Sequence, residues 1–241
     1  MPKYGSDYGE VTRATFNQHP KQFTCGFNSN MTKPQLILIG AGGHARSCID
    51  VIEQQGYFQI AGLVGLPEQR GVQHADYGYA VIGTDGDLFN LAKTYQYALI
   101  TIGQIQSSEH RIRLYQQATQ LGFQFPAIIA PTAHVSRHST LGAGTIVMHG
   151  AIVNAGASIG NNCIINSRAL IEHDARVEDH CHISTGAILN GDVTVGAGSF
   201  IGSGSIIKQG ITIGRDCLVG MGLGVRHDLT NCAQFTGYNR A

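Results

Sequence analysis

The chain has 241 residues, of which 32 are glycine and none is tryptophan, and 16 lysine and arginine residues balance 16 aspartate and glutamate residues. A net charge of zero with only 13% charged residues argues against a nucleic-acid partner, and the lack of an apolar run of about 18 residues argues against a membrane span. The six cysteines follow no secretory signal and have no metal-type spacing, which predicts reduced thiols, a cytoplasmic protein and no metal site.

The start of the chain is polar and aperiodic, which predicts a disordered leader or a tag over residues 1–33. An apolar run over residues 35–39 then ends in a glycine turn. The segment after this turn predicts a helix whose buried face carries Cys48, Ile49, Ile52 and Tyr57.

Strands and helices continue to alternate up to residue 126. We expect strands over residues 58–65, 79–83 and 97–103, and a short helix over residues 86–94. A longer helix is predicted from Ser107 or Ser108, as the N-cap, to Gly122 as the terminator. This alternation predicts a small Rossmann-like α/β domain with a parallel sheet over residues 34–128.

The second half of the chain is a repeat of six residues. Every sixth position from Val135 to Val225 is aliphatic, sixteen in succession, and a second, mostly small residue follows each of them by four positions. This period is typical of a parallel β-helix, in which three hexads of 18 residues form one triangular coil. We therefore predict a β-helix of about five coils, roughly 25 Å long, over residues 129–241. Cys163, Cys181 and Cys217 fall on the small inward position and are predicted to fill the interior.

Two segments together resemble a known family. The turn GAGGHAR (residues 40–46) and the hexad run INSRALIEHDARVEDHCHISTGAILNGDVTVG (residues 165–196) resemble hexapeptide-repeat acyltransferases, and more narrowly the bacterial N-acetyltransferases of nucleotide-linked amino sugars and their sialic acid O-acetyltransferase relatives. The resemblance implies a left-handed β-helix, acetyl-CoA as co-substrate, a nucleotide-linked amino sugar as acceptor, and a homotrimer with active sites between subunits.

His173 is the predicted catalytic residue. Ile171 points inward in its hexad, which leaves His173 and Asp174 on the outer surface near a corner. A neutral imidazole with a pKa near 6.5 suits the removal of a proton from an attacking amine. The resemblance implies that His173 is the general base and that Asp174 holds its ring in one tautomer.

Further site residues are implied by the resemblance alone. It places His182 against acetyl-CoA, from the neighbouring subunit's side of a groove, and Asn166 beside the sugar. Gly191, one coil after His173, would leave space for the thioester. The pantetheine arm would contact Ser203, Gly220, Met221 and Gly222. A plain corner or turn role remains the alternative for each of these residues.

The glycine turn itself fits G-x-G-x-x-A between a strand and a helix, which predicts phosphate binding by main-chain N–H groups. A dinucleotide would need an acidic residue at the end of the second strand, and the sequence LVGLP has none. The resemblance implies instead that Gly42, Gly43 and His44 cradle a nucleotide-sugar. It also implies that Gly103 and Gln104 make a second contact to the nucleotide, with a simple strand-ending turn as the alternative.

The sequence thus predicts N-acetylation of a nucleotide-linked amino-deoxy sugar by direct attack, without an acyl-enzyme. Two alternatives stay open: O-acetylation of sialic acid or a related sugar, and a non-catalytic β-helix protein that binds nucleotide-sugars. Nucleotidyl transfer is disfavoured, because the N-terminal domain is short and lacks the glycine-rich loop with a following lysine. The C-terminal residues 236–240 depart from the ending that is usual in the family, so adenine contacts are not assigned.

Overall fold

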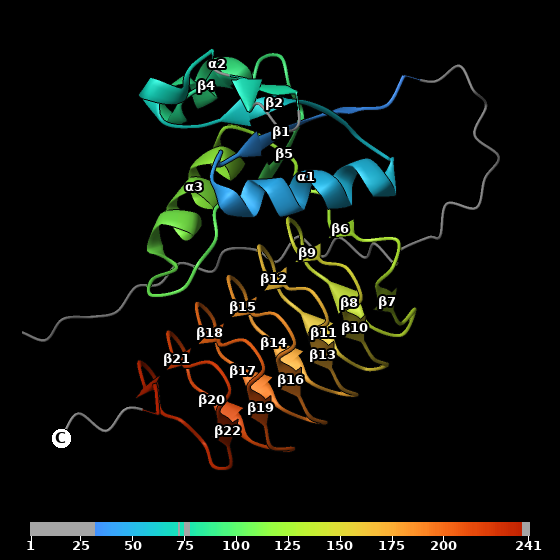
Figure 1. Ribbon diagram of the computed structural model, residues 1–241, viewed down its shortest axis with the longest axis vertical. Helices are drawn as coiled ribbons and strands as arrows, with labels where there is room; N and C mark the ends of the chain where they lie inside the picture. Colours follow the sequence, from blue (N-terminus) through green and yellow to red (C-terminus); the bar gives the residue numbers. More distant parts are fainter. Residues whose placement is uncertain (1–31, 72, 75–77, 238–241) are drawn as a thin grey trace, which may run out of the picture.

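A computed structural model describes residues 32–71, 73–74 and 78–237 of the chain (Figure 1). Residues 1–31 of the predicted leader lie outside the described residues. The described chain folds into a small α/β unit followed by a long stack of short strands. No helix in these ranges is long and apolar enough to cross a lipid bilayer.

The N-terminal unit is a five-stranded sheet in the order β3-β4-β2-β1-β5. Its parallel strands are β1 (Gln35–Ile39), β2 (Gln59–Val64), β4 (Tyr79–Gly83) and β5 (Tyr97–Ile100). The edge strand β3 (Gln73–His74) runs antiparallel to β4. The sheet is therefore mixed, whereas a parallel sheet was predicted. β3 has two residues only, too few to show a period in the sequence.

Helices cover both faces of this sheet. Helix α1 (Gly43–Gln55) packs on one face through Cys48, Ile49 and Ile52. Helices α2 (Leu88–Leu91) and α3 (Glu109–Gln120) pack on the other face, through apolar side chains such as Leu114. Single 3₁₀ turns, η1 (Pro67–Gln69) and η2 (Asp85–Asp87), connect the remaining segments. The predicted short helix is therefore η2 and α2 in succession.

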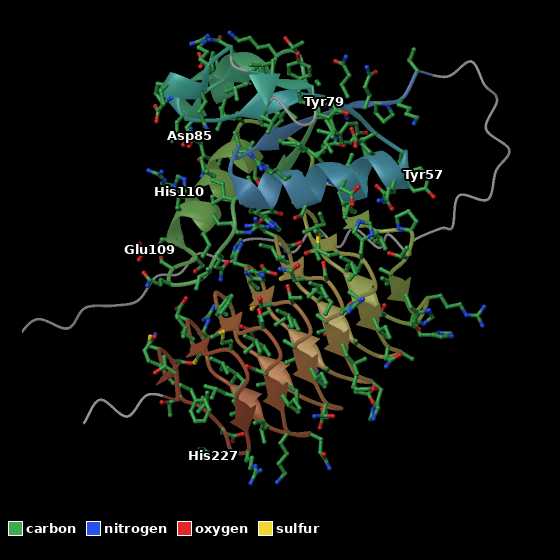
Figure 2. All side chains as sticks on the ribbon, in the orientation of Figure 1. Tyr57, Tyr79, Asp85, Glu109, His110 and His227 are labelled. Carbon is green, nitrogen blue, oxygen red and sulfur yellow. The ribbon has the colours of Figure 1, made fainter. Side chains whose placement is uncertain are left out.

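The end of α1 corrects one sequence prediction. Gly56 terminates the helix in the left-handed conformation, with φ 73°. Tyr57, predicted on the buried face of this helix, lies beyond its end and is 44% exposed (Figure 2). Ser108 is the N-cap of α3, and Gly122 has φ 93° just after its end.

The remaining strands form a left-handed parallel β-helix with three faces. The covered face, which packs against the N-terminal unit, consists of β6 (Ile128–Ile129), β9 (Ile146–Val147), β12 (Ile164–Ile165), β15 (His182–Ile183), β18 (Phe200–Ile201), β21 (Leu218–Val219) and β23 (Gln234–Phe235). The aliphatic face consists of β7 (His134–Val135), β10 (Ile152–Val153), β13 (Leu170–Ile171), β16 (Ile188–Leu189), β19 (Ile206–Ile207) and β22 (Gly224–Val225). The polar face consists of β8 (Thr140–Leu141), β11 (Ser158–Ile159), β14 (Arg176–Val177), β17 (Thr194–Val195) and β20 (Thr212–Ile213).

The register of these strands confirms the predicted coil of 18 residues, since Val153 pairs with Ile171, and Ile165 with Ile183. The aliphatic positions of the repeat line the interior. The small inward positions also satisfy backbone carbonyls: Thr145 Oγ1 donates to the Gly160 carbonyl at 2.7 Å, and Cys181 Sγ to the Gly196 carbonyl at 3.2 Å. The inward cysteines therefore fill space and donate weak hydrogen bonds.

The corners explain the glycine excess. Every sixth residue from 144 to 222 has a left-handed backbone, with φ between 52° and 76°. Glycine adopts this conformation without steric cost, and aspartate and asparagine tolerate it better than most residues. The non-glycine members of the series are Asn162, Arg168, Asp174, His180, Asp192 and Asp216.

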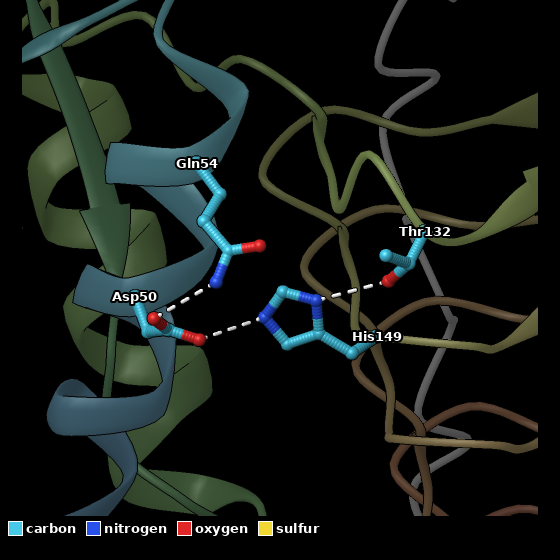
Figure 3. Close-up of polar contacts among 4 residues, drawn as sticks. All are labelled: Asp50, Gln54, Thr132 and His149. Carbon is cyan, nitrogen blue, oxygen red and sulfur yellow. Dashed lines mark hydrogen bonds and ion pairs between the residues drawn. The ribbon is translucent and has the colours of Figure 1, made fainter.

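Helix α1 lies between the sheet and the β-helix (Figure 1). Outward side chains of the covered face, Ile128, Ile146 and Ile164, join its buried residues in one apolar cluster. A polar contact adds to this interface (Figure 3): His149 Nε2 lies 2.9 Å from Asp50 Oδ2 on α1, and His149 Nδ1 lies 3.0 Å from Thr132 Oγ1. The boundary predicted between residues 128 and 129 falls within β6.

Candidate active site

His173 stands on the edge between the aliphatic and polar faces, which we call the His173 edge. Strand β13 ends at the inward Ile171, and the chain then turns the corner into β14. The His173 side chain is 66% exposed on this edge. In a triangular prism the edge between two faces lies opposite the third, so the His173 edge lies opposite the covered face.

The ring of His173 is oriented by its neighbour. His173 Nδ1 lies 2.9 Å from Asp174 Oδ2. A carboxylate oxygen can only accept, so Nδ1 carries the hydrogen and the lone pair of Nε2 is left for a proton. The hydrogen bond to Asp174, and the nearby charges of Asp174, Glu172 and Asp192, raise the pKa of His173 above 6.5. Asp174 has a left-handed backbone, with φ 60°, as do the other corner residues of its series. In this conformation its carboxylate forms the hydrogen bond with His173.

Gly191 lies beneath the His173 ring. A Cβ built at Gly191 would lie 2.6 Å from His173 Cε1 and Nε2, closer than van der Waals contact allows. Gly191 was predicted to leave space for the thioester. In this structure the imidazole of His173 fills the space next to Gly191. Any side chain at Gly191 would displace that ring.

His182 lies on the covered face and is 7% exposed. Its Nδ1 lies 2.7 Å from the Gln104 carbonyl, and its Nε2 lies 3.1 Å from Asn166 Nδ2. Because the carbonyl accepts and the amide nitrogen donates, the ring is held neutral with its hydrogen on Nδ1. Burial lowers the pKa of His182 to about 4, and Phe200 packs edge-on against the ring at 5.1 Å between centroids.

His44, in the first turn of α1, lies above this cluster. Its ring centroid is 6.5 Å from that of His182, and its Nε2 is 3.4 Å from Cys48 Sγ. Burial, with smaller contributions from Arg111 and His182, lowers the pKa of His44 to about 3. His44 is therefore a neutral imidazole at physiological pH, able to accept or donate hydrogen bonds but not to supply a positive charge.

The predicted nucleotide residues come together around His44. Gly42, the N-cap of α1, and Gly43 are exposed, and so is Gly103, whose Cα faces the His44 Cβ. Gln104, predicted as part of a second contact to the nucleotide, is 2% exposed, and its Nε2 donates to the Gly198 carbonyl at 3.0 Å. This side chain braces the N-terminal unit on the β-helix, and its buried Oε1 has no partner among the described residues.

A cavity of about 290 Å³ opens next to this cluster, between the start of α3 and the covered face. Its lining includes Ser108, Gly198, Phe200 and Asp216, together with the exposed Ile105. Phe200 therefore separates this cavity from His182, against whose ring it packs.

Arg111 is a buried residue of this region that the sequence did not predict. It is 1% exposed, and its guanidinium donates to the carbonyls of Ile100 and Ile102 at 2.8 Å and of Asn162 at 3.3 Å. These bonds tie β5 and the following turn to the β-helix. Burial lowers the pKa of Arg111 to about 10, so it stays charged at neutral pH. A signal was present, because Arg111 shares the apolar face of α3 with Leu114 and Ala118.

The residues predicted for the pantetheine arm lie on the edge between the covered and aliphatic faces. Met221 is 77% exposed there, and Ser203 Oγ lies 2.9 Å from Ser184 Oγ. Gly222 has the left-handed backbone of the corner series, and Gly220 packs against the main chain of Thr236. This edge is distinct from the His173 edge of the same chain.

The predicted site is therefore divided in a single chain. The cluster around His44 and His182 lies between the N-terminal unit and the covered face, while His173 stands on the opposite edge. Among the contacts of the described residues, the two groups share no partner. One copy brings together the residues predicted to bind the nucleotide, and it holds His173, the predicted base, on another edge.

Comparison with known families matches both parts of the chain. Residues 35–118 match the PglD N-terminal domain, and residues 192–226 match the hexapeptide repeat of succinyl-transferase. No curated protein sequence matches the chain significantly.

Three solved structures share the architecture of this chain. The perosamine N-acetyltransferase of Caulobacter crescentus, crystallised with CoA and GDP-perosamine, is 33% identical with a TM-score of 0.76, over 83% of this chain and 92% of that one. The acetyltransferase domain of PglB from Neisseria gonorrhoeae, in complex with acetyl coenzyme A, is 30% identical with a TM-score of 0.74, over 83% and 95%. WeeI from Acinetobacter baumannii is 21% identical with a TM-score of 0.69, over 82% and 94%, and shares the fold.

Proposed function

Because this chain belongs to the hexapeptide-repeat acyltransferases and is an acetyl-CoA-dependent acyltransferase, we propose that it acetylates the amine of a nucleotide-linked amino-deoxy sugar with His173 as general base. The observation that carries this proposal is the His173–Asp174 pair, at 2.9 Å on an exposed edge, in which His173 Nε2 makes no hydrogen bond to any described residue. The relatives crystallised with GDP-perosamine and with acetyl coenzyme A support the substrate class.

The chemistry is a direct transfer. The neutral amine of the sugar attacks the thioester carbonyl carbon, and His173 Nε2 takes the proton that the nitrogen loses. The tetrahedral adduct collapses by breaking the C–S bond, and the proton passes to the leaving thiolate to give CoA. Asp174 stabilises the imidazolium that exists between these two transfers.

Four of the five described cysteines support transfer without an acyl-enzyme, because they are buried; the fifth, Cys232, is exposed just before β23. Cys163, Cys181 and Cys217 point into the β-helix, and Cys48 lies on the buried face of α1. Burial raises the pKa of Cys48 to about 12, which keeps the thiol protonated and poorly nucleophilic. The amine itself is therefore the nucleophile in our scheme.

The active site forms between two copies of the chain in this proposal, and we expect a homotrimer. The aliphatic face carries an outward ladder of four apolar residues, Ile152, Leu170, Ile188 and Ile206, in register on successive coils. Ile152 and Ile206 are 39% and 50% exposed. This ladder borders the His173 edge, so a second copy packed on it would bring its own acceptor-binding side close to His173.

Subunit mixing tests this assembly. Two variants, His173→Ala and His182→Ala, should each be nearly inactive alone, because each lacks one half of every site. Co-expression in equal amounts should restore about a quarter of wild-type activity, since one pairing in four joins an intact His173 to an intact His182. The two variants carry different affinity tags, so that assemblies containing both are purified over two columns. Turnover is then measured on these mixed assemblies. Mixtures that stay as inactive as their components would contradict a shared site.

Acceptor screening tests the function itself. Release of free CoA thiol from acetyl-CoA is followed with UDP-, dTDP- and GDP-linked amino-deoxy sugars and with free sialic acid. Turnover with a nucleotide-linked amino sugar is the expected result. Turnover with sialic acid alone would establish O-acetylation instead, and nucleotide-sugar binding without turnover of any acceptor would establish a non-catalytic binding protein.

The pH dependence of kcat/KM should report the protonation of His173 and its interaction with Asp174. Since His173 acts as a base only when neutral, and Asp174 raises its pKa, kcat/KM of the wild type should fall as the pH drops through a value above 6.5. Asp174→Asn removes the charge that raises this pKa, so the acid limb should move to lower pH and the maximal rate should fall by about tenfold or more.

Asp192→Asn is the matched control for this profile. Asp192 also raises the pKa of His173, but as the smallest of the causes, and its carboxylate makes no hydrogen bond to the ring. The acid limb of the pH profile of Asp192→Asn should therefore stay close to that of the wild type. A profile that is flat from about pH 5 to 8 in the wild type would exclude His173 as the base.

A further inference from the structure

His44 and Cys48 form a hydrogen-bonded pair along helix α1. Cys48 follows His44 by four positions, so the two side chains lie on the same side of the helix, one turn apart. His44 Nε2 lies 3.4 Å from Cys48 Sγ. Cys48 is 0% exposed and packs in the apolar cluster that joins α1 to the sheet and the covered face. The pair therefore connects this core to the glycine turn at the start of the helix.

The thiol is the donor in this pair. A sulfur atom accepts hydrogen bonds weakly, whereas the lone pair of a neutral imidazole nitrogen is a good acceptor. Burial raises the pKa of Cys48 to about 12 and lowers the pKa of His44 to about 3, so both groups are neutral at physiological pH. The thiol forms no hydrogen bond with any other described residue. The S–H of Cys48 therefore donates to His44 Nε2.

This hydrogen bond selects one tautomer of His44. When Nε2 of a neutral imidazole holds the lone pair, the hydrogen is on Nδ1. His44 Nδ1 makes no hydrogen bond to a described residue, so its N–H is left for a ligand. The side chain starts between the two turns that were predicted to contact a nucleotide, since a Cβ built at Gly103 would lie 3.6 Å from His44 Cβ.

The surroundings of His44 favour an anion. Gly42 is the N-cap of α1 and supplies no side-chain acceptor, and the first turn of the helix has no acidic residue. The positive end of the helix dipole and the first backbone N–H groups attract negative charge at this end. An Nδ1–H adds another donor for an oxyanion. In the opposite tautomer Nδ1 would carry a lone pair, which repels an oxyanion.

We propose that Cys48 is a positioning residue that holds His44 in the Nδ1–H tautomer, in which His44 donates a hydrogen bond to a diphosphate oxygen of the acceptor. The inference rests on the proposed function, because it takes a nucleotide-linked sugar to lie at the glycine turn. Cys48 is closed to solvent and acts on the ligand only through His44. The pair explains how a histidine that stays neutral contributes to the binding of an anion.

The tautomer of His44 tests the inference without any ligand. Long-range ¹⁵N–¹H NMR of protein with ¹⁵N-labelled histidine shows which ring nitrogen carries the hydrogen, and the loss of signals in His44→Gln assigns them. The wild type should carry the hydrogen on Nδ1. Cys48→Val and Cys48→Ala remove the S–H, so both tautomers should be populated, whereas Cys48→Ser keeps a donor and should keep the wild-type pattern. A hydrogen on Nε2 in the wild type, or one pattern in all variants, would overturn the proposal.

Calorimetry with UDP, dTDP and GDP as probes tests the effect on binding. For the probe that binds the wild type most tightly, Cys48→Val should weaken the Kd by about fivefold and Cys48→Ser by less than about twofold, as expected for one hydrogen bond. Ser47→Ala, at the exposed neighbouring position of α1, is the control and should leave the Kd unchanged. Equal Kd values for wild type and Cys48→Val, or no binding of any probe, would overturn the diphosphate contact.

Steady-state kinetics separates this inference from the function on which it rests. Cys48→Val should raise the KM for the acceptor by about fivefold and leave kcat and the KM for acetyl-CoA unchanged. A fall in kcat together with a lower thermal unfolding midpoint in Cys48→Val, Cys48→Ala and Cys48→Ser alike would mean that Cys48 only fills space, and would overturn its positioning role. Failure of the wild type to acetylate any acceptor would instead refute the proposed function, while the NMR pattern would still decide the tautomer.

Discussion

His173→Ala should lower kcat by about 10²- to 10⁴-fold, the range that loss of a positioned general base produces. The amine then has no group to accept its proton as the C–N bond forms, and water takes this role poorly. The side chain is 66% exposed and packs into no core cluster, so the thermal unfolding midpoint should stay close to that of the wild type. Steady-state thiol release with the best acceptor measures the effect.

A second variant separates proton transfer from simple occupancy. His173→Asn keeps a side-chain amide that can still donate to Asp174, but it has no basic nitrogen. It should therefore lose as much kcat as the alanine variant. His110→Ala, on the exposed surface of α3, is the control and should retain full activity. Undiminished turnover in both His173 variants would remove this residue from the mechanism.

Arg111→Met should lower the free energy of unfolding by about 3–5 kcal/mol. Methionine fills much of the same volume, but the carbonyls of Ile100, Ile102 and Asn162 lose their donor in a site closed to water. Each buried acceptor left unpaired costs about 1–3 kcal/mol. Urea denaturation followed by circular dichroism measures the change, at constant protein concentration so that assembly contributes equally.

Arg113→Met provides the matched control two residues along the same helix. Arg113 is exposed and bonds to the ring of His110 alone among the contacts described for it, so its loss should cost less than about 0.5 kcal/mol. Arg111→Lys keeps the charge but not the several N–H donors of the guanidinium. Its loss in free energy of unfolding should lie between those of Arg111→Met and Arg113→Met. If Arg111→Met were as stable as the control, the guanidinium would not hold the two parts of the fold together.

The repeat made the β-helix predictable in detail. An aliphatic residue that recurs every six positions fixes the inward side of each strand, and three such positions close a coil, so the register of Val153 with Ile171 follows from spacing alone. The strand, glycine turn and helix around residues 35–55 are equally local. Two predictions failed. The strand β3 has only two residues, too few to give a pattern in the sequence. Tyr57 was placed on helix α1, but Gly56 ends that helix before it.

The candidate site divides in the same way. Its residue types were visible in the sequence, and the placement of His173 and Asp174 outside the core followed from the inward Ile171. Burial of Gln104 and His182 was not visible, since it arises from contact between segments 78 residues apart. The hydrogen bonds of Gln104 Nε2 to the Gly198 carbonyl and of His182 Nδ1 to the Gln104 carbonyl cross the interface, so these side chains brace it as well as line it.

The sequence by itself determined the two folding units, the pitch of the coil and the position of His173 and Asp174 outside the core, because each depends on side chains at short, regular spacing. The tertiary structure decided which residues are neutral, buried or free. Desolvation keeps His44 and His182 uncharged, Arg111 remains a buried cation between the two units, and His173 stands on the edge opposite both histidines. These properties depend on how the sheet docks on the covered face, and that docking is set by packing across the whole interface rather than by any local pattern.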